Sequence, residues 1–172
     1  MGPLRAVAAV LAAVAILANA SPAAAAAPSA TNYWTTTPGW AHLIVEDHTA
    51  GAWPVARAVA MWGSGLTLGT CNYRHGCIRV FNERISADYD GLTTWHAADN
   101  IYHRKVRIVL NARYRNSDTA RERYEATLHE LGHSLGLNHD TTGGCMYPVN
   151  NGLHAYVSSG ERAVLRRAYG VS

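Results

Sequence analysis

Residues 128–140 read Leu-His-Glu-Leu-Gly-His-Ser-Leu-Gly-Leu-Asn-His-Asp, and this segment constrains the chain more than any other. On a helix, positions i and i+4 lie on one face about one turn apart, so His129 and His133 can each offer a ring nitrogen to the same metal ion. Gly136 stands where the helix should end and the chain reverse, a step that favours positive φ and therefore glycine. Such a turn would bring His139 back as a third ligand.

This ligand pattern is typical of a catalytic zinc site. A zinc ion with three protein ligands keeps a fourth position open for water, whereas a structural site usually fills all four. Glu130 lies between the first two histidines and remains free to accept a proton from that water. The sequence therefore predicts zinc-dependent hydrolysis with Glu130 as the catalytic residue.

The pattern His-Glu-x-x-His-x-x-Gly-x-x-His resembles the signature of the metzincin zinc metallopeptidases. In that family a methionine-containing turn follows, and residues 143–148 here read Gly-Gly-Cys-Met-Tyr-Pro. The resemblance makes Met146 the residue beneath the zinc ion. Some metzincins carry an additional tyrosine ligand two residues after the methionine, but Tyr147 follows Met146 directly, so that role is not carried over.

Either of two adjacent residues, His139 or Asp140, could be the third ligand. Among the enzymes that the chain resembles, bacterial snapalysins use an aspartate as third ligand, whereas matrixins use a histidine. His139 has the offset from Gly136 that the signature requires, and we expect it to be the ligand, with Asp140 as the alternative. If His139 binds the metal, we expect Asp140 to support the loop by hydrogen bonding.

The first 27 residues have the pattern of a secretory signal peptide. Arg5 precedes an apolar run at residues 6–18 that is too short to span a bilayer, and small-residue cleavage sites follow near residues 20 and 27. A flexible leader over residues 28–39 and a catalytic domain over residues 40–172 are predicted to follow. We therefore expect a secreted, extracellular protein without stable membrane association after cleavage; an N-terminal membrane anchor is the alternative.

Three cysteines in a secreted chain suggest one disulfide and one free thiol. Cys71 and Cys77 enclose a turn-forming segment, so a short disulfide between them is the favoured pairing. Cys145 would then be free, although its pairing with either of the others stays open. The formal net charge of +3 is too small to indicate a nucleic-acid partner, and we expect a monomer.

Hydrophobic periodicity predicts a single α+β domain. Strands are expected at residues 42–46, 77–81, 91–97 and 105–110, and a helix at residues 54–62. Ser117 or Asp118 should cap a long helix that ends near Leu135, and Ser158 should cap a final helix that Gly170 stops. This order matches a metzincin-like domain with a mixed, mostly parallel twisted sheet, an active-site helix and a C-terminal helix.

The function that follows from the motif and the resemblance is peptide-bond hydrolysis by a secreted zinc endopeptidase. A protein or peptide substrate in extended conformation should pair with the edge strand at residues 93–97. His96 could touch this substrate, although an ordinary surface position is the favoured interpretation for it. Two alternatives remain: a secreted zinc-binding or peptide-binding protein without turnover, and a zinc esterase or amidase acting on small substrates. Glu130 distinguishes the enzymes from the binding protein, because a pure binding site has no need of it.

Overall fold

The computed structural model describes residue 30 and residues 33–34, 43–63, 65–71, 76–86, 88–98 and 101–169. The predicted signal peptide and most of the predicted leader lie outside these residues. The strands are β1 (Tyr33–Trp34), β2 (Leu43–His48), β3 (Leu66–Leu68), β4 (Cys77–Glu83), β5 (Gly91–Ala98) and β6 (Ile101–Asn111), and the helices are α1 (Val55–Trp62), α2 (Ala120–Ser134) and α3 (Ser159–Tyr169). The predicted α+β class and the C-terminal helix are confirmed.

All the strands belong to one mixed sheet in the order β1-β6-β4-β2-β3, and β5 also pairs with β6. The pairs β1–β6, β4–β6, β2–β4 and β2–β3 are parallel, whereas β5 runs antiparallel to β6. The sheet is therefore mostly parallel, as predicted. Within the described part of the chain β5 has β6 as its sole strand partner, so β5 is an edge strand.

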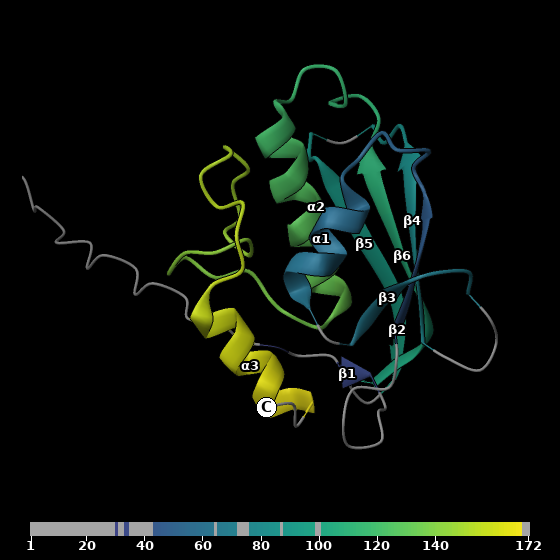
Figure 1. Ribbon diagram of the computed structural model, residues 1–172, viewed down its shortest axis with the longest axis vertical. Helices are drawn as coiled ribbons and strands as arrows, with labels where there is room; N and C mark the ends of the chain where they lie inside the picture. The colour runs from purple at the N-terminus through teal and green to yellow at the C-terminus, as the bar shows by residue number, and fades with distance from the viewer. Residues whose placement is uncertain are drawn as a thin grey trace, which may run out of the picture.

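Helices α1 and α2 lie together on one side of the sheet (Figure 1). Helix α1 contacts α2 and β3, and α2 contacts β5 and β6. On β6, Val106 and Ile108 are buried while Arg107 between them is exposed, which is the alternation expected of a strand with one covered face, whereas Ile108, Val109 and Leu110 are all buried at the end of the strand. The Trp62 indole of α1 donates a hydrogen bond to the Leu128 carbonyl of α2, 3.1 Å away, and ties the two helices together.

The N-cap of α2 is Thr119, two residues after Ser117 and one after Asp118. The Thr119 hydroxyl accepts the Glu122 N–H, and the Glu122 carboxylate accepts the Thr119 N–H. Ser117 and Asp118 are used by the preceding turn, where the Ser117 hydroxyl and the Asp118 N–H both donate to the Tyr114 carbonyl. The predicted cap was therefore wrong by one or two positions.

Two short strands were not predicted. β3 contains three residues and β1 only two, too few to show a hydrophobic period. Trp34 of β1 is nevertheless only 6% exposed, and its indole donates to the Ser134 carbonyl at the end of α2, 2.8 Å away. Trp34, which lies in the segment predicted as a leader, thus contributes to the packing around α2.

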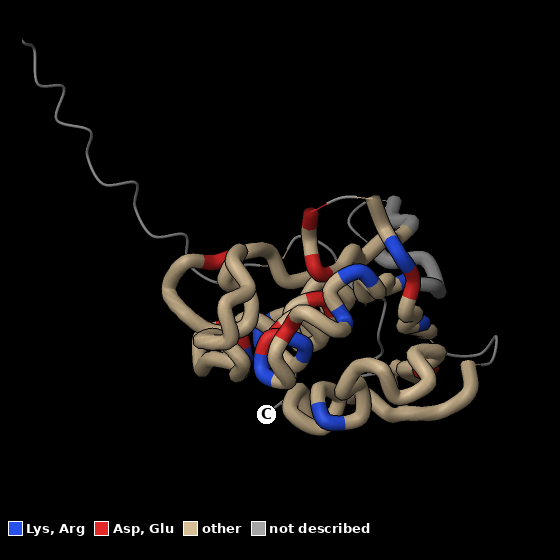
Figure 2. Tube along the Cα trace, turned by 90° about the horizontal axis from the view of Figure 1, so that it is seen from above, with Lys and Arg blue, Asp and Glu red and all other residues tan. Residues whose placement is uncertain are grey.

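The predicted disulfide between Cys71 and Cys77 is confirmed, and Cys145 is a buried free thiol. Acidic and basic positions are interspersed along the chain, as Figure 2 shows, in keeping with the small net charge. Among the described residues, none of the helices has both the length and the apolar character that crossing a bilayer requires.

Candidate metal centre

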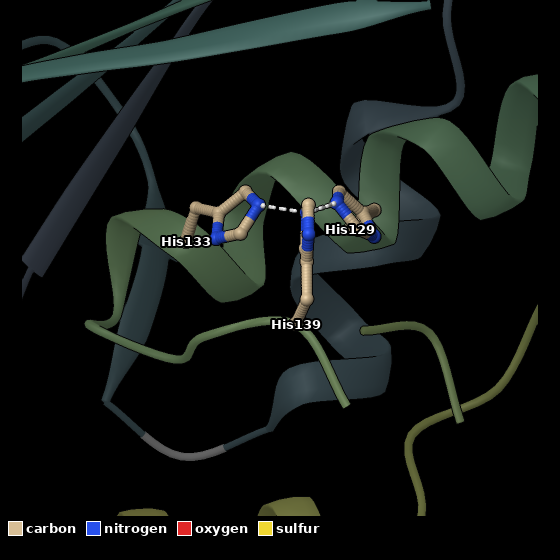
Figure 3. A group of neighbouring side chains, drawn as sticks. All are labelled: His129, His133 and His139. Carbon is tan, nitrogen blue, oxygen red and sulfur yellow. Dashed lines mark hydrogen bonds between the residues drawn. The ribbon is translucent and has the colours of Figure 1, made fainter. Parts of the chain in front are cut away.

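Three histidine side chains converge at the end of α2. His129 and His133 lie one turn apart on the helix, and Gly136, with φ of 95°, turns the chain so that His139 faces them. The Nε2 atom of His139 lies 3.1 Å from the Nε2 atom of His129 and 3.1 Å from that of His133 (Figure 3). The structure therefore brings together the three residues that the spacing indicated.

The other ring nitrogens of the two helical histidines face backbone carbonyls. His129 Nδ1 lies 2.7 Å from the Cys145 oxygen, and His133 Nδ1 lies 2.8 Å from the Leu137 oxygen. A carbonyl oxygen can only accept, so each Nδ1 carries the proton of a neutral imidazole. The Nε2 lone pairs of His129 and His133 consequently point inward, toward His139.

This arrangement fits a bound metal ion. A hydrogen on His139 Nε2 could serve only one of the two facing lone pairs, whereas a shared cation satisfies all three nitrogens. Nitrogens bound about 2.0–2.1 Å from a tetrahedral ion are about 3.3 Å apart, close to the observed 3.1 Å. The group can therefore hold a metal ion with little movement of the side chains.

The protonation states of the histidines favour metal binding. Burial, with a contribution from His133, lowers the pKa of His129 to about 3, and burial also lowers the pKa of His133. Both rings are therefore neutral at physiological pH. A metal ion needs no proton to leave these two ligands, so binding does not compete with protonation near pH 7.

Glu130 is positioned by the edge strand. Its side chain is buried, and the Thr93 hydroxyl of β5 lies 2.5 Å from its Oε2 atom and 3.0 Å from its carbonyl oxygen. Burial raises the pKa of Glu130 to about 7, against the opposing effect of the Thr93 hydrogen bond. A carboxyl group with a pKa near the ambient pH is suited to accept and release a proton.

The turn that contains Met146 packs directly against α2. Met146 is fully buried, and a Cβ atom on Gly132 would overlap its sulfur. Gly132 lies between the two helical ligands in the sequence, so its lack of a side chain allows Met146 to approach the helix beside the metal group. The Met146 carbonyl accepts the Asp140 N–H at 3.0 Å, which joins this turn to the loop that carries His139.

Asp140, the alternative third ligand, does not belong to the histidine group. Its side chain is fully buried, and Oδ1 accepts hydrogen bonds from the Thr142 N–H at 2.9 Å and from the Thr142 hydroxyl at 3.0 Å. The structure thus places His139 with the other two histidines and Asp140 in the loop that supports it.

A cleft of about 640 Å³ runs beside the histidines. It is lined by β5, α2 and the segment at residues 147–150.

Sequence reasoning missed Gly91 on β5, where an added Cβ would come within 2.5 Å of the Glu130 Cγ atom. Sequence reasoning placed Thr93 in the edge strand but did not link Thr93 to Glu130. Nothing in the sequence indicates that these two residues come into contact, because they meet only when the chain folds. The side chain of His96 lies outside the described part of the structure.

No protein-family model matches this chain, and a comparison with curated proteins finds no match either. The interpretation of the site therefore depends on its own geometry and chemistry.

Proposed function

We propose that this protein is a secreted zinc-dependent endopeptidase of the metzincin kind. The observation that carries the proposal is the convergence of the three Nε2 atoms, within 3.1 Å of His139 in each case, next to a buried glutamate. Three imidazoles are a ligand set typical of catalytic zinc. A purely structural site would have a fourth protein ligand, and the group found among the described residues consists of three histidines.

His129, His133 and His139 would hold the zinc ion, and the carbonyls of Cys145 and Leu137 fix the orientation of the first two rings. A zinc ion bound there would supply Lewis-acid chemistry toward the scissile carbonyl and a water of lowered pKa. Glu130 takes the proton from that water and passes it to the leaving amine. The Thr93 hydroxyl holds the carboxylate in place between these two transfers.

The substrate is proposed to bind as an extended strand. β5 is the strand of the sheet that borders the cleft, and its second edge is free of strand pairing within the described residues. A peptide added to this edge gains backbone hydrogen bonds that set its register relative to Glu130. Secretion is proposed from Arg5 and the apolar run at residues 6–18.

Replacement of Glu130 tests the function. Glu130→Ala should bind zinc with unchanged stoichiometry, measured by atomic emission, and should lose casein cleavage by a factor of about 100 to 10,000, the usual contribution of general acid–base catalysis. Glu83→Gln is the matched control, because Glu83 is an exposed carboxylate that pairs with Arg107 on β6.

Three outcomes separate the alternatives. Unchanged casein cleavage by Glu130→Ala would refute the role of this residue. A wild-type protein that binds zinc and peptides but cleaves nothing would be a binding protein. Cleavage of small esters or amides without cleavage of a broad peptide library would identify an esterase or amidase.

A further inference from the structure

The cleft beside the histidines is acidic. Besides Glu130, its lining includes Asp88, Asp90 and Glu125, and no lysine or arginine is found among the described residues that line it. Carboxylates on the walls of a cleft raise the local concentration of cations and disfavour anions. The charge of the cleft therefore depends on how far each carboxylate is neutralised by a neighbour.

Among the described residues, two of these carboxylates, Asp90 and Glu125, have hydrogen-bond partners that are neutral. Asp88 forms an exposed ion pair with Arg113 at 2.8 Å. Asp90 accepts a hydrogen bond from the Asn150 amide at 2.7 Å, and Glu125 accepts the N–H groups of His154 at 2.9 Å and Asn151 at 3.4 Å. Glu125 is only 1% exposed, yet it lines the cleft. Its charge is thus held away from bulk water and screened weakly.

A divalent ion on the histidines would add two positive charges, because its ligands are neutral imidazoles. Those charges would lie at the histidine group and not at Asp90 and Glu125, which are the nearer charges for a side chain bound beside them. Glu125 lies four residues before His129 on α2 and therefore one turn farther along the same helix face. The negative charge is concentrated one helical turn from the metal group, where it can attract a substrate cation.

A further acceptor lies at the same place. Asn150 lines the cleft, its amide nitrogen donates to Asp90, and its Oδ1 atom is buried without a hydrogen-bond partner among the described residues. A buried acceptor without a donor is costly, so this oxygen favours a ligand that carries N–H groups.

The outer part of the cleft is apolar. Tyr89 is 48% exposed and Val149 is 55% exposed, and both line the cleft. Lysine and arginine side chains combine an apolar stem with a charged head, and they cover apolar surface while their heads bind acceptors. The cleft matches this combination, with apolar walls outside and acceptors inside.

We propose that the cleft binds a lysine or arginine side chain of the substrate next to the scissile bond, with its charged head facing the partly buried Asp90. The buried Glu125 carboxylate and Asn150 oxygen add to the negative potential there. The stem of the basic side chain lies against Tyr89 and Val149. This inference rests on the proposed peptidase function and adds the class of substrate to it: peptides cleaved beside a basic residue.

Matched peptides test the inference. A series carrying lysine, arginine, norleucine or glutamate at each position that flanks the cleaved bond should show a preference for the basic residue over norleucine of about tenfold or more in kcat/KM. Glu125→Gln keeps the shape of the side chain and one acceptor oxygen, and it should reduce this preference to about threefold or less. Glu83→Gln should leave the preference unchanged.

A second variant and a binding assay distinguish a loss of specificity from misfolding of the first variant. Asp90→Asn changes the charge without touching the hydrogen bonds of Glu125 to the loop, and it should also reduce the preference. In the Glu130→Gln background, fluorescence anisotropy should show tighter binding of lysine peptides than of norleucine peptides. Cleavage with equal or better use of norleucine would overturn the inference and leave the peptidase standing, whereas no cleavage and no binding of any peptide would overturn the proposed function itself.

Discussion

Gly91 is the residue at which a small change should stop catalysis without touching a metal ligand. A Cβ atom at this position would lie 2.5 Å from Glu130 Cγ, 2.7 Å from Oε1 and 2.8 Å from Cδ. All three atoms belong to one buried side chain, so Gly91→Ala must push Glu130 away from β5 or push β5 away from α2. The histidines make no such contact with Gly91 and should keep their arrangement.

The size of the effect follows from the distances. Ordinary contacts of a Cβ atom begin near 3.4 Å, so the Glu130 side chain must move by about 0.9 Å to accommodate the methyl group. A misplacement of about 1 Å in a catalytic group can cost about 100-fold in rate. We therefore expect kcat for peptide hydrolysis to fall about 100-fold in Gly91→Ala, with zinc stoichiometry unchanged.

The assay compares kcat on a fluorogenic peptide with zinc content and with the midpoint of thermal unfolding. Gly69→Ala is the matched control, because a Cβ at Gly69 would meet Ile44 at an ordinary 3.6 Å. Wild-type kcat in a folded, zinc-loaded Gly91→Ala protein would refute the reasoning that this contact positions Glu130. Loss of zinc from the variant would show that the strand supports the metal ligands as well.

Further predictions concern the acid–base group, the metal and the methionine turn. The Thr93 hydrogen bond lowers the pKa of Glu130, so Thr93→Val should raise that pKa further above its ordinary value of 4.5. Because the base must be ionised, the acid limb of the pH profile of kcat/KM should then move to higher pH. Thr93→Ser keeps the hydroxyl and should leave the acid limb in place. Removal of zinc by a chelator should abolish cleavage. For an ion present at about 100 times its Kd, the removal should also lower the free energy of unfolding by about 2.7 kcal/mol. Calorimetry should show this as a fall in Tm of roughly 5 to 10 °C. Glu161 is fully buried and accepts the N–H groups of Met146 and Ser158. Glu161→Gln should therefore lower the free energy of unfolding, measured by urea titration, by about 1 to 3 kcal/mol. An unchanged urea midpoint would contradict this.

The parts of the structure that the sequence predicted well are those determined locally. His129 and His133 belong to one helix, and Gly136 adopts the positive φ that brings His139 back within a few residues. The same holds for the Cys71–Cys77 disulfide, which closes a short turn. In each case the spacing along the chain nearly determines the distance in space, and neighbouring residues suffice to argue the contact.

The partners of Glu130 could not be predicted, because they depend on packing between distant segments. Thr93 reaches Glu130 across 37 residues, and the close approach of Gly91 depends on how β5 lies against α2. A threonine and a glycine in an edge strand are ordinary residues there, with no pattern that marks them. Only the three-dimensional structure shows that the strand expected to bind substrate also holds the Glu130 carboxylate.

The C-terminal helix is linked to the histidine group in a way that its sequence pattern does not reveal. Glu161 completes the capping box of α3 with Ser158, and it also accepts the Met146 N–H at 2.7 Å. The carbonyl of Cys145, directly before Met146, orients His129. Because one carboxylate fixes both the start of α3 and the turn that aims a metal ligand, the helix and the ligand geometry are coupled. Loosening α3 at its first turn should therefore weaken metal binding, although no residue of that helix belongs to the metal-binding histidine group.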